Sequence, residues 1–261
     1  MKKMKIIFVN YSIGGYAGDS VSMTTIVKGL EDRGHEVIIV TTDGDGYFYD
    51  KIRSKMYAPI RKKLLGANGN IIKIDEMSVY PIHCVSNRFG MYCPSAAKEA
   101  RKIIKKFDVV YVINWYYHLG MVFAKISHEL GVPFIIGPMA SLEKNAQNIK
   151  RNRKSLLDKL YTNKMIDHAT GFHCVGEHER KSLMKLGANS EKIHLINNGI
   201  VRPTNNSKDD TIFKKIKIDN KNDEYLITVG QINEKKGLDV LIRAFTQVVK
   251  DRKIKLVIAG T

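Results

Sequence analysis

Short apolar segments alternate with helical segments along most of this chain, and this alternation restricts the fold more than any other feature. Residues 5–10 are apolar, residues 20–33 carry apolar side chains near helical spacing, and residues 37–41 are apolar again. Short strands without polar alternation are typical of parallel sheets that helices cover on both faces. The start of the chain therefore predicts a β-α-β unit.

The same alternation continues and predicts one large α/β domain. Further strands are predicted at residues 70–74, 109–113, 134–136, 171–175 and 193–196. Further helices are predicted at residues 96–106, 119–130, 155–169 and 177–186. Gly34, Gly131 and Gly187 directly follow predicted helices, which is where helix-ending glycines lie. We expect a doubly wound, Rossmann-like α/β domain with a parallel sheet.

The composition changes beyond residue 202, and the change predicts a domain boundary. Residues 203–223 are rich in Asn, Asp, Lys and Ser and are interpreted as a connector. Residues 224–261 then predict a strand, a helix and a strand, the opening of a second Rossmann-like unit. A segment below about 40 residues cannot bury a core of its own. We therefore expect residues 1–202 to form the first domain and residues 224–261 to form an incomplete second domain with an uncovered apolar face.

Composition also restricts the partners and the compartment. The 43 Lys and Arg residues against 26 Asp and Glu give a formal net charge of +17. This excess favours anionic lipid headgroups, phosphorylated substrates or nucleic acid, unless lysine serves only as a general solubilising residue. Three cysteines without a C-x-x-C pair favour a reducing compartment. The first apolar run is too short for a signal peptide and no run suffices for a membrane span, so we expect a cytoplasmic protein.

In open parallel sheets, ligands bind beyond the carboxyl ends of the strands. The first such loop contains Gly14 and Gly15, whose backbone amides could approach a phosphate. Its spacing is neither the dinucleotide-binding fingerprint nor a P-loop, so a plain tight turn is the alternative. Asp43 ends the second strand, where a ribose-binding acid would lie in a nicotinamide enzyme. His83 and Cys84 suggest a metal site, but no ligand spacing supports one.

The loop after the strand at 109–113 gathers aromatic and polar side chains: Asn114, Trp115, Tyr116, Tyr117 and His118. Aromatic faces pack against the C–H-rich faces of sugar rings, while Asn and His supply hydrogen bonds. This loop is therefore a candidate wall of a site for a sugar or a lipid headgroup. A partly buried hydrophobic plug is the alternative.

Three further loops follow predicted strands. The loop at 137–143 precedes a basic stretch at 144–164, which is either a solvated helix face or a surface that meets a bilayer. Glu177 and Glu179 begin a helix, where carboxylates suit the helix dipole without any function. Lys236 stands beside a glycine at a helix N-terminus and is either a clamp for a diphosphate or an ordinary surface lysine.

Taken together, these stretches resemble glycosyltransferase family 4, the retaining nucleotide-sugar transferases with the GT-B fold of two facing Rossmann-like domains. The resemblance covers nearly the whole chain, in segments that occur in the right order. These are KIIFVNYSIGG with KGLEDRGHEVIIVTTD, VPFIIGPMASLEKNA, HATGFHCVGEHERKSLMKLGANSEKIHLINNGI, and VGQINEKKGLDVLIRAF.

The resemblance implies that the C-terminal domain binds the nucleotide-sugar donor. Lys236 matches the lysine that neutralises the donor diphosphate, and Gln231 occupies the place where an arginine usually shares that task. Gly230 belongs to the same turn, and Gly14 and Gly15 match a glycine loop that approaches the donor phosphates. The family needs no metal and no cofactor, since side-chain cations and helix dipoles stabilise the charge that grows on the leaving nucleotide.

The resemblance also implies that the N-terminal domain binds the acceptor. The acceptor-binding candidates are Asn114, Trp115, Tyr117, Met139 and Glu177. Met139 and the residue after it stand where a His-Gly pair is common in the family. His118 on the neighbouring loop is the candidate catalytic replacement for that histidine.

The function that the resemblance implies is transfer of a sugar, with retention, to a glycan or lipid-linked acceptor in cell-surface polysaccharide or glycolipid synthesis. Attachment to the inner face of the membrane would fit the basic surface. The paired-glutamate segment that grips the donor would lie beyond Thr261, so the chain as given is expected to bind donor poorly and not to turn over. A non-catalytic glycan- or lipid-binding module is the alternative. A nicotinamide dehydrogenase is disfavoured by the glycine spacing, and a nucleic-acid-binding protein by the lack of a recognised module.

Overall fold

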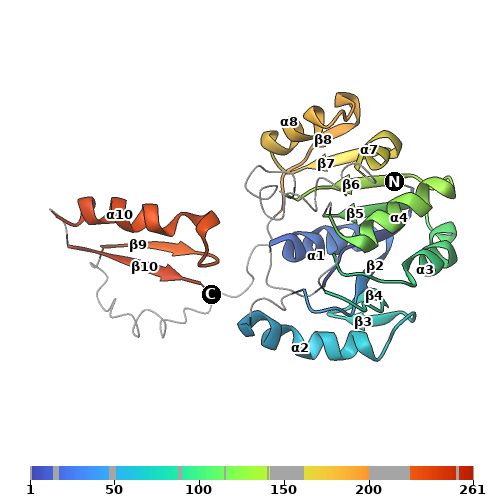
Figure 1. Cartoon of the computed structure of the whole chain (residues 1–261), viewed down its shortest axis with the longest axis horizontal. Coiled ribbons are helices and arrows are strands. Elements are labelled where there is room, and N and C mark those ends of the chain that lie inside the picture. Colours follow the sequence, from blue (N-terminus) through green and yellow to red (C-terminus); the bar gives the residue numbers. More distant parts are fainter. Residues whose placement is uncertain are drawn as a thin grey trace. The chain divides into compact units, whose positions relative to one another are not determined.

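The computed structural model describes residues 2–13, 18–46, 51–87, 90–114, 116–139, 141, 162–199, 224–250 and 253–260. The chain divides into two compact units, unit 1 at Met1–Val201 and unit 2 at Arg202–Thr261, and each is treated by itself (Figure 1). The predicted connector at 203–223 lies outside the described residues.

The described part of unit 1 contains an eight-stranded sheet with the order β3-β4-β2-β1-β5-β6-β7-β8. The strands are β1 (Lys5–Val9), β2 (Glu36–Thr42), β3 (Ile72–Ile74), β4 (Met77–Ile82), β5 (Val109–Ile113), β6 (Phe134–Gly137), β7 (Gly171–Cys174) and β8 (Ile193–Leu195). The helices are α1 (Gly18–Glu31), α2 (Lys51–Leu65), α3 (Ala96–Ile103), η1 (Ile104–Lys106), α4 (His118–Glu129), α7 (Asn163–His168), α8 (Glu177–Lys185) and η3 (Ser190–Lys192).

The prediction of a parallel, doubly wound sheet is confirmed. The central strand β1 pairs in parallel with β2, where Ile7 lies opposite Ile38, and with β5, where Ile7 lies opposite Val110. One strand departs from the prediction, because β3 runs antiparallel to β4. The two strands are joined by Asp75 and Glu76, which both have positive φ angles (47° and 69°), as a tight hairpin requires.

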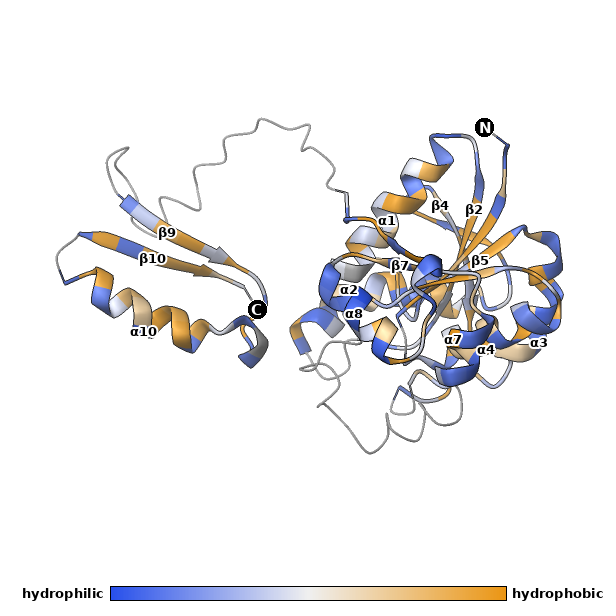
Figure 2. Cartoon of the chain, turned by 90° about the horizontal axis from the view of Figure 1, so that it is seen from above, coloured by the Kyte–Doolittle hydropathy of each residue, from blue (hydrophilic) through white to orange (hydrophobic). Residues whose placement is uncertain are grey.

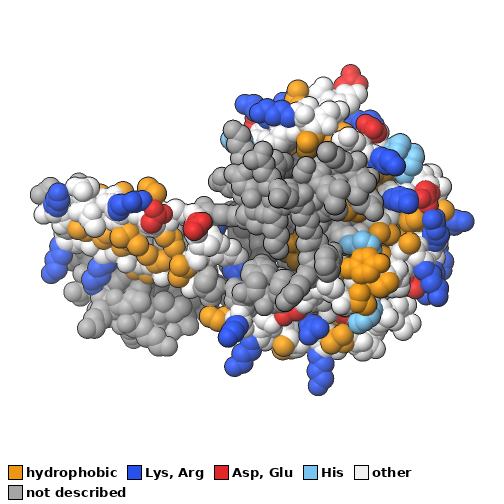
Figure 3. Space-filling model, viewed as in Figure 1, with side chains coloured by type: hydrophobic (Ala, Val, Ile, Leu, Met, Phe, Trp, Pro, Cys, Tyr) orange, Lys and Arg blue, Asp and Glu red, His pale blue; other side chains and the backbone are white. Residues whose placement is uncertain are grey.

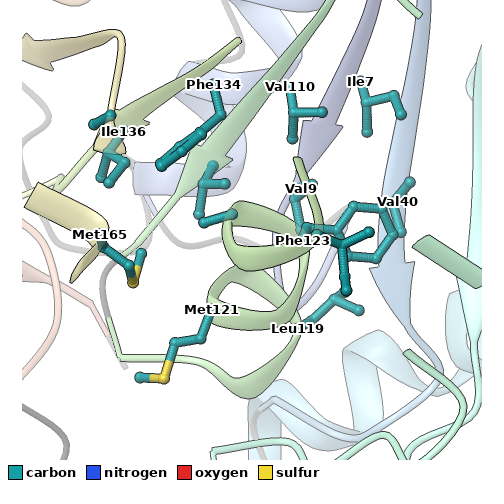
Figure 4. Packing of buried hydrophobic residues seen from close by; sticks show 14 of the residues in the cluster. Ile7, Val9, Val40, Val110, Leu119, Met121, Phe123, Phe134, Ile136 and Met165 are labelled. Atoms are coloured by element: carbon teal, nitrogen blue, oxygen red, sulfur yellow. The ribbon is translucent and has the colours of Figure 1, made fainter. Parts of the chain in front are cut away.

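Two buried clusters explain the unbroken apolar strands. On one face of the sheet, Ile7 and Val9 pack with residues of α3 and α4 such as Phe123. Figure 4 shows Phe123 beside Val9 and Val40 of the sheet. On the other face, Phe8 packs with residues of α1 and α2 such as Tyr57. Successive residues of β1 therefore point into different cores, and each must be apolar because helices cover both faces.

Unit 2 is a single β-α-β unit in its described residues. It contains β9 (Glu224–Val229), η4 (Glu234–Lys236), α10 (Leu238–Val248) and β10 (Ile254–Ala259), and β9 and β10 are parallel. None of its described residues is buried. Its aliphatic side chains are exposed, among them Leu226, Ile227, Val229, Val240, Ile242 and Ile258. Figure 2 shows the apolar strands of both units and an apolar stripe on α10. The prediction that this segment cannot bury a core is confirmed for these residues.

Within the part of the chain that the structure describes, no helix combines the length and the apolar character needed to cross a membrane.

Candidate functional site

The order of the sheet reverses between β1 and β5, which is where a doubly wound sheet opens a crevice for ligands. Asn10 follows β1 and Asn114 follows β5, so both side chains lie at this point. The Nδ2 of Asn114 donates a hydrogen bond to the Oδ1 of Asn10 over 3.1 Å, and the backbone N–H of Tyr11 donates to the same oxygen over 2.9 Å. Both Asn side chains are buried. The side chain of Asn114, a predicted acceptor-binding residue, therefore links the loop after β5 to the loop after β1.

The predicted residues Tyr117 and His118 lie at the start of α4, next to the loop that follows β1. The ring of Tyr117 stacks on that of Tyr11, with the ring centroids 3.9 Å apart. The Nδ1 of His118 accepts a hydrogen bond from the backbone N–H of Cys93 over 3.3 Å. A neutral His118 therefore carries its proton on Nε2 and can donate from that atom. Burial lowers the pKa of His118, which favours this neutral form.

Met139 and Glu177, two other predicted acceptor-binding residues, differ in their surroundings. Met139 is half-buried, has a positive φ of 49°, and packs against the core beneath α1 and α2. Glu177 is exposed and lies 3.6 Å from Arg180. The neighbouring Glu179 is the buried carboxylate, and it accepts a hydrogen bond from the backbone N–H of Val175 over 2.9 Å. The structure therefore gives Glu179 a role in fixing the turn between β7 and α8.

Glu179 also acts on the end of β7 through its charge. Burial, with the Glu179 carboxylate as the second cause, raises the pKa of the Cys174 thiol to about 12. Burial and then the same carboxylate raise the pKa of the Tyr111 hydroxyl. The Tyr111 hydroxyl is hydrogen-bonded to Nδ1 of His173, whose Nε2 lies 2.7 Å from the backbone carbonyl of Ile196. This end of the sheet is thus a buried polar network that holds β5, β7 and the loop after β8 together.

Sequence reasoning considered Asp43 and His83 but did not join them. Asp43 follows β2 and His83 follows β4, and these two strands are neighbours. The Nδ1 of His83 lies 2.7 Å from Oδ2 of Asp43, and the backbone N–H of Cys84 donates to Oδ1 of Asp43 over 2.7 Å. A prediction of the strand β4 would have placed His83 at the same edge of the sheet as Asp43. The sequence analysis did not predict this strand.

Cys84 and Cys93 lie on the segment between β4 and α3, and their thiols interact. The hydrogen bond with Cys93 lowers the pKa of Cys84, while the same contact and burial raise the pKa of Cys93. Among the residues that the structure describes, no group of three or more His, Cys, Asp or Glu side chains is arranged to hold a metal ion.

The predicted donor-binding residues of unit 2 lie together. Gly230, Gln231 and Lys236 line a cavity of about 60 Å³ at the carboxyl ends of β9 and β10. A Cβ atom on Gly230 would lie 3.7 Å from Cε of Lys236, so the lysine side chain passes directly over the glycine turn. Gly237, the residue before α10, has a left-handed φ of 60°, and Leu238, the first residue of α10, lines the same cavity. A cation, a glycine turn and a helix N-terminus at one place can hold a diphosphate.

Three predicted site residues, Gly14, Gly15 and Trp115, lie outside the described residues.

Comparisons with known proteins bear on the fold and the family. The chain is similar to the Anabaena protein Alr3699/HepE, whose structure was solved in complex with UDP-glucose, with 16% identity and a TM-score of 0.55. That likeness covers 99% of this chain and 70% of HepE. The chain is also similar to the UDP-GlcNAc 2-epimerase of Neisseria meningitidis bound to UDP-GlcNAc, with 14% identity and a TM-score of 0.56. Here the likeness covers 98% of this chain and 65% of the epimerase, so the chain spans less than two thirds of that enzyme.

These low identities show a shared fold, and the search of curated proteins by sequence finds no match to this chain. Two family models match the sequence directly. The model Glycosyl transferases group 1 matches residues 209–261, which include β9, α10 and β10. The model Glycosyltransferase Family 4 matches residues 16–202, which is more than half of the chain. The chain therefore belongs to glycosyltransferase family 4.

Proposed function

We propose that this protein transfers a sugar from a nucleotide-sugar to a hydroxyl group of a glycan or lipid-linked acceptor. The observation that carries the proposal is the arrangement of Gly230, Gln231 and Lys236 at the carboxyl ends of β9 and β10, within the segment that a glycosyltransferase model matches. The solved neighbours in complex with UDP-glucose and UDP-GlcNAc support a UDP-sugar as the donor.

In the proposed reaction, the bond between the anomeric carbon and the diphosphate oxygen breaks and negative charge develops on the leaving nucleotide. The Lys236 ammonium and the N-terminus of α10 stabilise that charge, so no metal is needed for this step. The acceptor oxygen bonds to the anomeric carbon on the face that the diphosphate leaves, and its proton passes to a diphosphate oxygen. This geometry retains the anomeric configuration. Gln231 supplies hydrogen bonds where an arginine would add a second charge, so Lys236 carries most of the electrostatic stabilisation.

The first experiment compares the binding of UDP and uridine by isothermal calorimetry. UDP should bind more tightly than uridine, because only UDP offers a diphosphate to the turn. Lys236→Ala should weaken UDP binding about tenfold, the loss of one charge-assisted contact, and should leave uridine unchanged. Lys250→Ala, at the far end of α10, is the matched control and should bind UDP normally. If both lysine variants bind UDP as the wild type does, the assignment of the donor site is wrong.

A second part of the proposal places the protein on the inner face of a membrane, where it would build a cell-surface polysaccharide or glycolipid. The sequence analysis considered the basic stretch at 144–164 as the surface that meets a bilayer, but this stretch is largely outside the described residues. The supporting observation is instead α2, which carries no acidic residue. Its solvent-facing side combines four lysines with exposed apolar side chains: Lys51, Lys55, Lys62 and Lys63, with Ile52, Met56 and Leu65.

Basic and apolar side chains on one helix face are typical of helices that lie on anionic lipid. In Figure 3, Lys and Arg side chains project along the lower edge of unit 1, where α2 lies in Figure 1. The helix α2 also contacts the end of β2, because Nε of Arg61 donates to the backbone carbonyl of Asp43 over 3.0 Å. A membrane that bound α2 would therefore lie close to the carboxyl ends of β2 and β4, and a lipid-linked acceptor could reach unit 1 from there.

Sedimentation with vesicles tests this second part. Vesicles that contain phosphatidylglycerol should bind the protein, and pure phosphatidylcholine vesicles should not. The double variant Lys55→Glu and Lys62→Glu should reduce binding more than tenfold, since each cation near an anionic surface contributes about 1 kcal/mol. The control Lys105→Glu and Lys106→Glu makes the same charge change on η1. Equal loss in both double variants would show that only net charge matters, and the role of α2 would be wrong.

A further inference from the structure

Asp43 and His83 form a pair that none of the proposed donor or acceptor contacts uses. The side chain of Asp43 is 2% exposed and that of His83 is 52% exposed, so a buried carboxylate holds an imidazole that faces solvent. Both oxygens of Asp43 are engaged, Oδ2 with Nδ1 of His83 and Oδ1 with the backbone N–H of Cys84. The backbone N–H of His83 also donates, to Oδ1 of Asn68 over 3.0 Å. The imidazole is therefore fixed at its ring and at its backbone.

These contacts set which nitrogen of His83 carries the proton. An ionised carboxylate only accepts hydrogen bonds, so Nδ1 of His83 has to donate to Asp43. In the neutral ring, Nε2 is then left with a lone pair and accepts. A hydroxyl group can donate to such a nitrogen, whereas a phosphate or carboxylate ligand cannot. The Asp43 charge behind the ring further disfavours an anion.

His118, the first residue of α4, has the opposite arrangement. Its Nδ1 accepts from Cys93, so its Nε2 donates. The backbone N–H of Cys93 donates directly to the His118 imidazole, whereas the backbone N–H of Cys84 donates to Asp43, the carboxylate that holds His83. Tyr92, which lies between the two cysteines in the sequence, is 42% exposed, and its ring lies edge-on to that of His118 with the ring centroids 4.7 Å apart. One acceptor, one donor and an aromatic ring are the groups that bind a polyhydroxylated ring.

We propose that His83, positioned by Asp43, binds a hydroxyl group of the carbohydrate acceptor by accepting its hydrogen bond at Nε2. That this sugar is the acceptor of the transfer rests on the proposed function. The ligand class, a neutral sugar, follows from the side chains themselves. His83 is then a binding residue, and Asp43 is a positioning residue that acts through it.

The experiment follows the imidazole nitrogens of the whole chain by ¹⁵N NMR at neutral pH. The first spectrum should show His83 protonated at Nδ1 and His118 protonated at Nε2. The probes are then the methyl glycosides of glucose, galactose, mannose and N-acetylglucosamine, with inorganic phosphate as the anionic comparison. At least one glycoside should shift the Nε2 resonance of His83 saturably, and phosphate should not.

Three substitutions separate binding from folding. In His83→Asn, the amide N–H₂ can still donate to Asp43, but no acceptor remains at the position of Nε2. We expect the same denaturation midpoint as the wild type and glycoside binding weakened at least about tenfold. In His83→Gln, the longer side chain can place its carbonyl near the position of Nε2, so binding should recover to within about threefold of the wild type. In Asp43→Asn, the single amide oxygen cannot fully accept both from Nδ1 of His83 and from the backbone N–H of Cys84. His83 should therefore lose part of its protonation at Nδ1.

Each other outcome overturns the inference. His83 protonated at Nε2, a response to phosphate instead of glycosides, no response to any glycoside of the panel, or equal glycoside binding in His83→Asn would all contradict it. The UDP titration is independent of these results, because His83→Asn leaves unit 2 unchanged. If glycosides bind at His83 while UDP binds nowhere, the proposed transferase function fails and the sugar site stands.

Discussion

Asn114 shows how a single residue can determine the shape of the site. It has a positive φ of 68° directly after β5, and its amide donates to the buried Asn10. Few residues other than glycine adopt this backbone conformation without strain, and asparagine is one of those that does so most readily. Asn114 therefore combines a turn that reverses the chain into α4 with a hydrogen bond that links the loops after β1 and β5.

Two substitutions separate these roles. Asn114→Gly keeps the backbone conformation and loses the hydrogen bond, which should cost about 1 kcal/mol of unfolding free energy. Asn114→Ala loses the hydrogen bond and also places a Cβ in the left-handed region, so it should cost about 1 kcal/mol more than the glycine variant. Urea denaturation measures both values. If the alanine variant is as stable as the glycine variant, residue 114 does not require a left-handed backbone conformation.

At the residue scale, the sequence predicted the loops better than it predicted the roles within them. The strand-end rule found Asn114, Tyr117 and His118 because the strand before them is a clear apolar run. It could not show that Asn114 turns inward to meet Asn10, since that contact joins residues 104 positions apart. Asp43 ends a predicted strand, where a ribose-binding acid would lie in a nicotinamide enzyme, but the sequence could not connect it to His83 because only the fold brings β2 and β4 together.

At the scale of elements, α4 packs against β5 through a glycine. A Cβ atom on Gly120 would lie 2.8 Å from Cγ1 of Val112, which is too close for two carbons. Gly120→Ala should therefore destabilise the protein by about 1–3 kcal/mol, as overpacked cores do. Gly29→Ala in α1 is the matched control, because its nearest neighbour would be at an ordinary 3.5 Å. That variant should stabilise the protein by about 0.5–1 kcal/mol through helix propensity.

Urea denaturation of both variants, and of Gly120→Ala combined with Val112→Ala, tests this packing. The cost of Gly120→Ala should be smaller when Val112 is shortened, since the clash is with the removed methyl group. Equal costs in the two backgrounds would mean that α4 does not rest on β5 through this contact.

The sequence analysis missed α2 and β4 because neither shows the residue pattern that is typical of its kind of element. The helix α2 has its buried residues Arg53, Tyr57 and Leu64 on a narrow face among lysines, and it contains Pro59, so no apolar period stands out. The strand β4 contains Pro81, which normally argues against a strand interior. The hairpin before β4 turns through Asp75 and Glu76, without the Asn-Gly or Gly pair that marks such turns. By contrast, the sequence analysis predicted β1, β2, β5 and β6, because each of these strands is a short and nearly unbroken apolar run.

At the scale of the whole molecule, the two units of the chain carry different kinds of surface. Unit 1 has a core on each face of its sheet, and tyrosine and histidine side chains lie beyond the ends of its strands. Unit 2 positions its cation and glycine turn through the pairing of β9 with β10 and through backbone hydrogen bonds within the turn, such as that from Lys236 N–H to the carbonyl of Asn233, and none of its described residues is buried. The composition change beyond residue 202 indicated this division, whereas the local geometry around Lys236 required the structure.

The most direct test of the account is a map of the backbone amides that respond to UDP, recorded by ¹⁵N–¹H correlation spectra of the whole chain. The account predicts saturable shifts at Gly230, Gln231, Lys236 and Gly237, and no such shifts with uridine. Shifts that are absent from these amides, or confined to unit 1, would contradict the claim that unit 2 binds the diphosphate of the sugar donor.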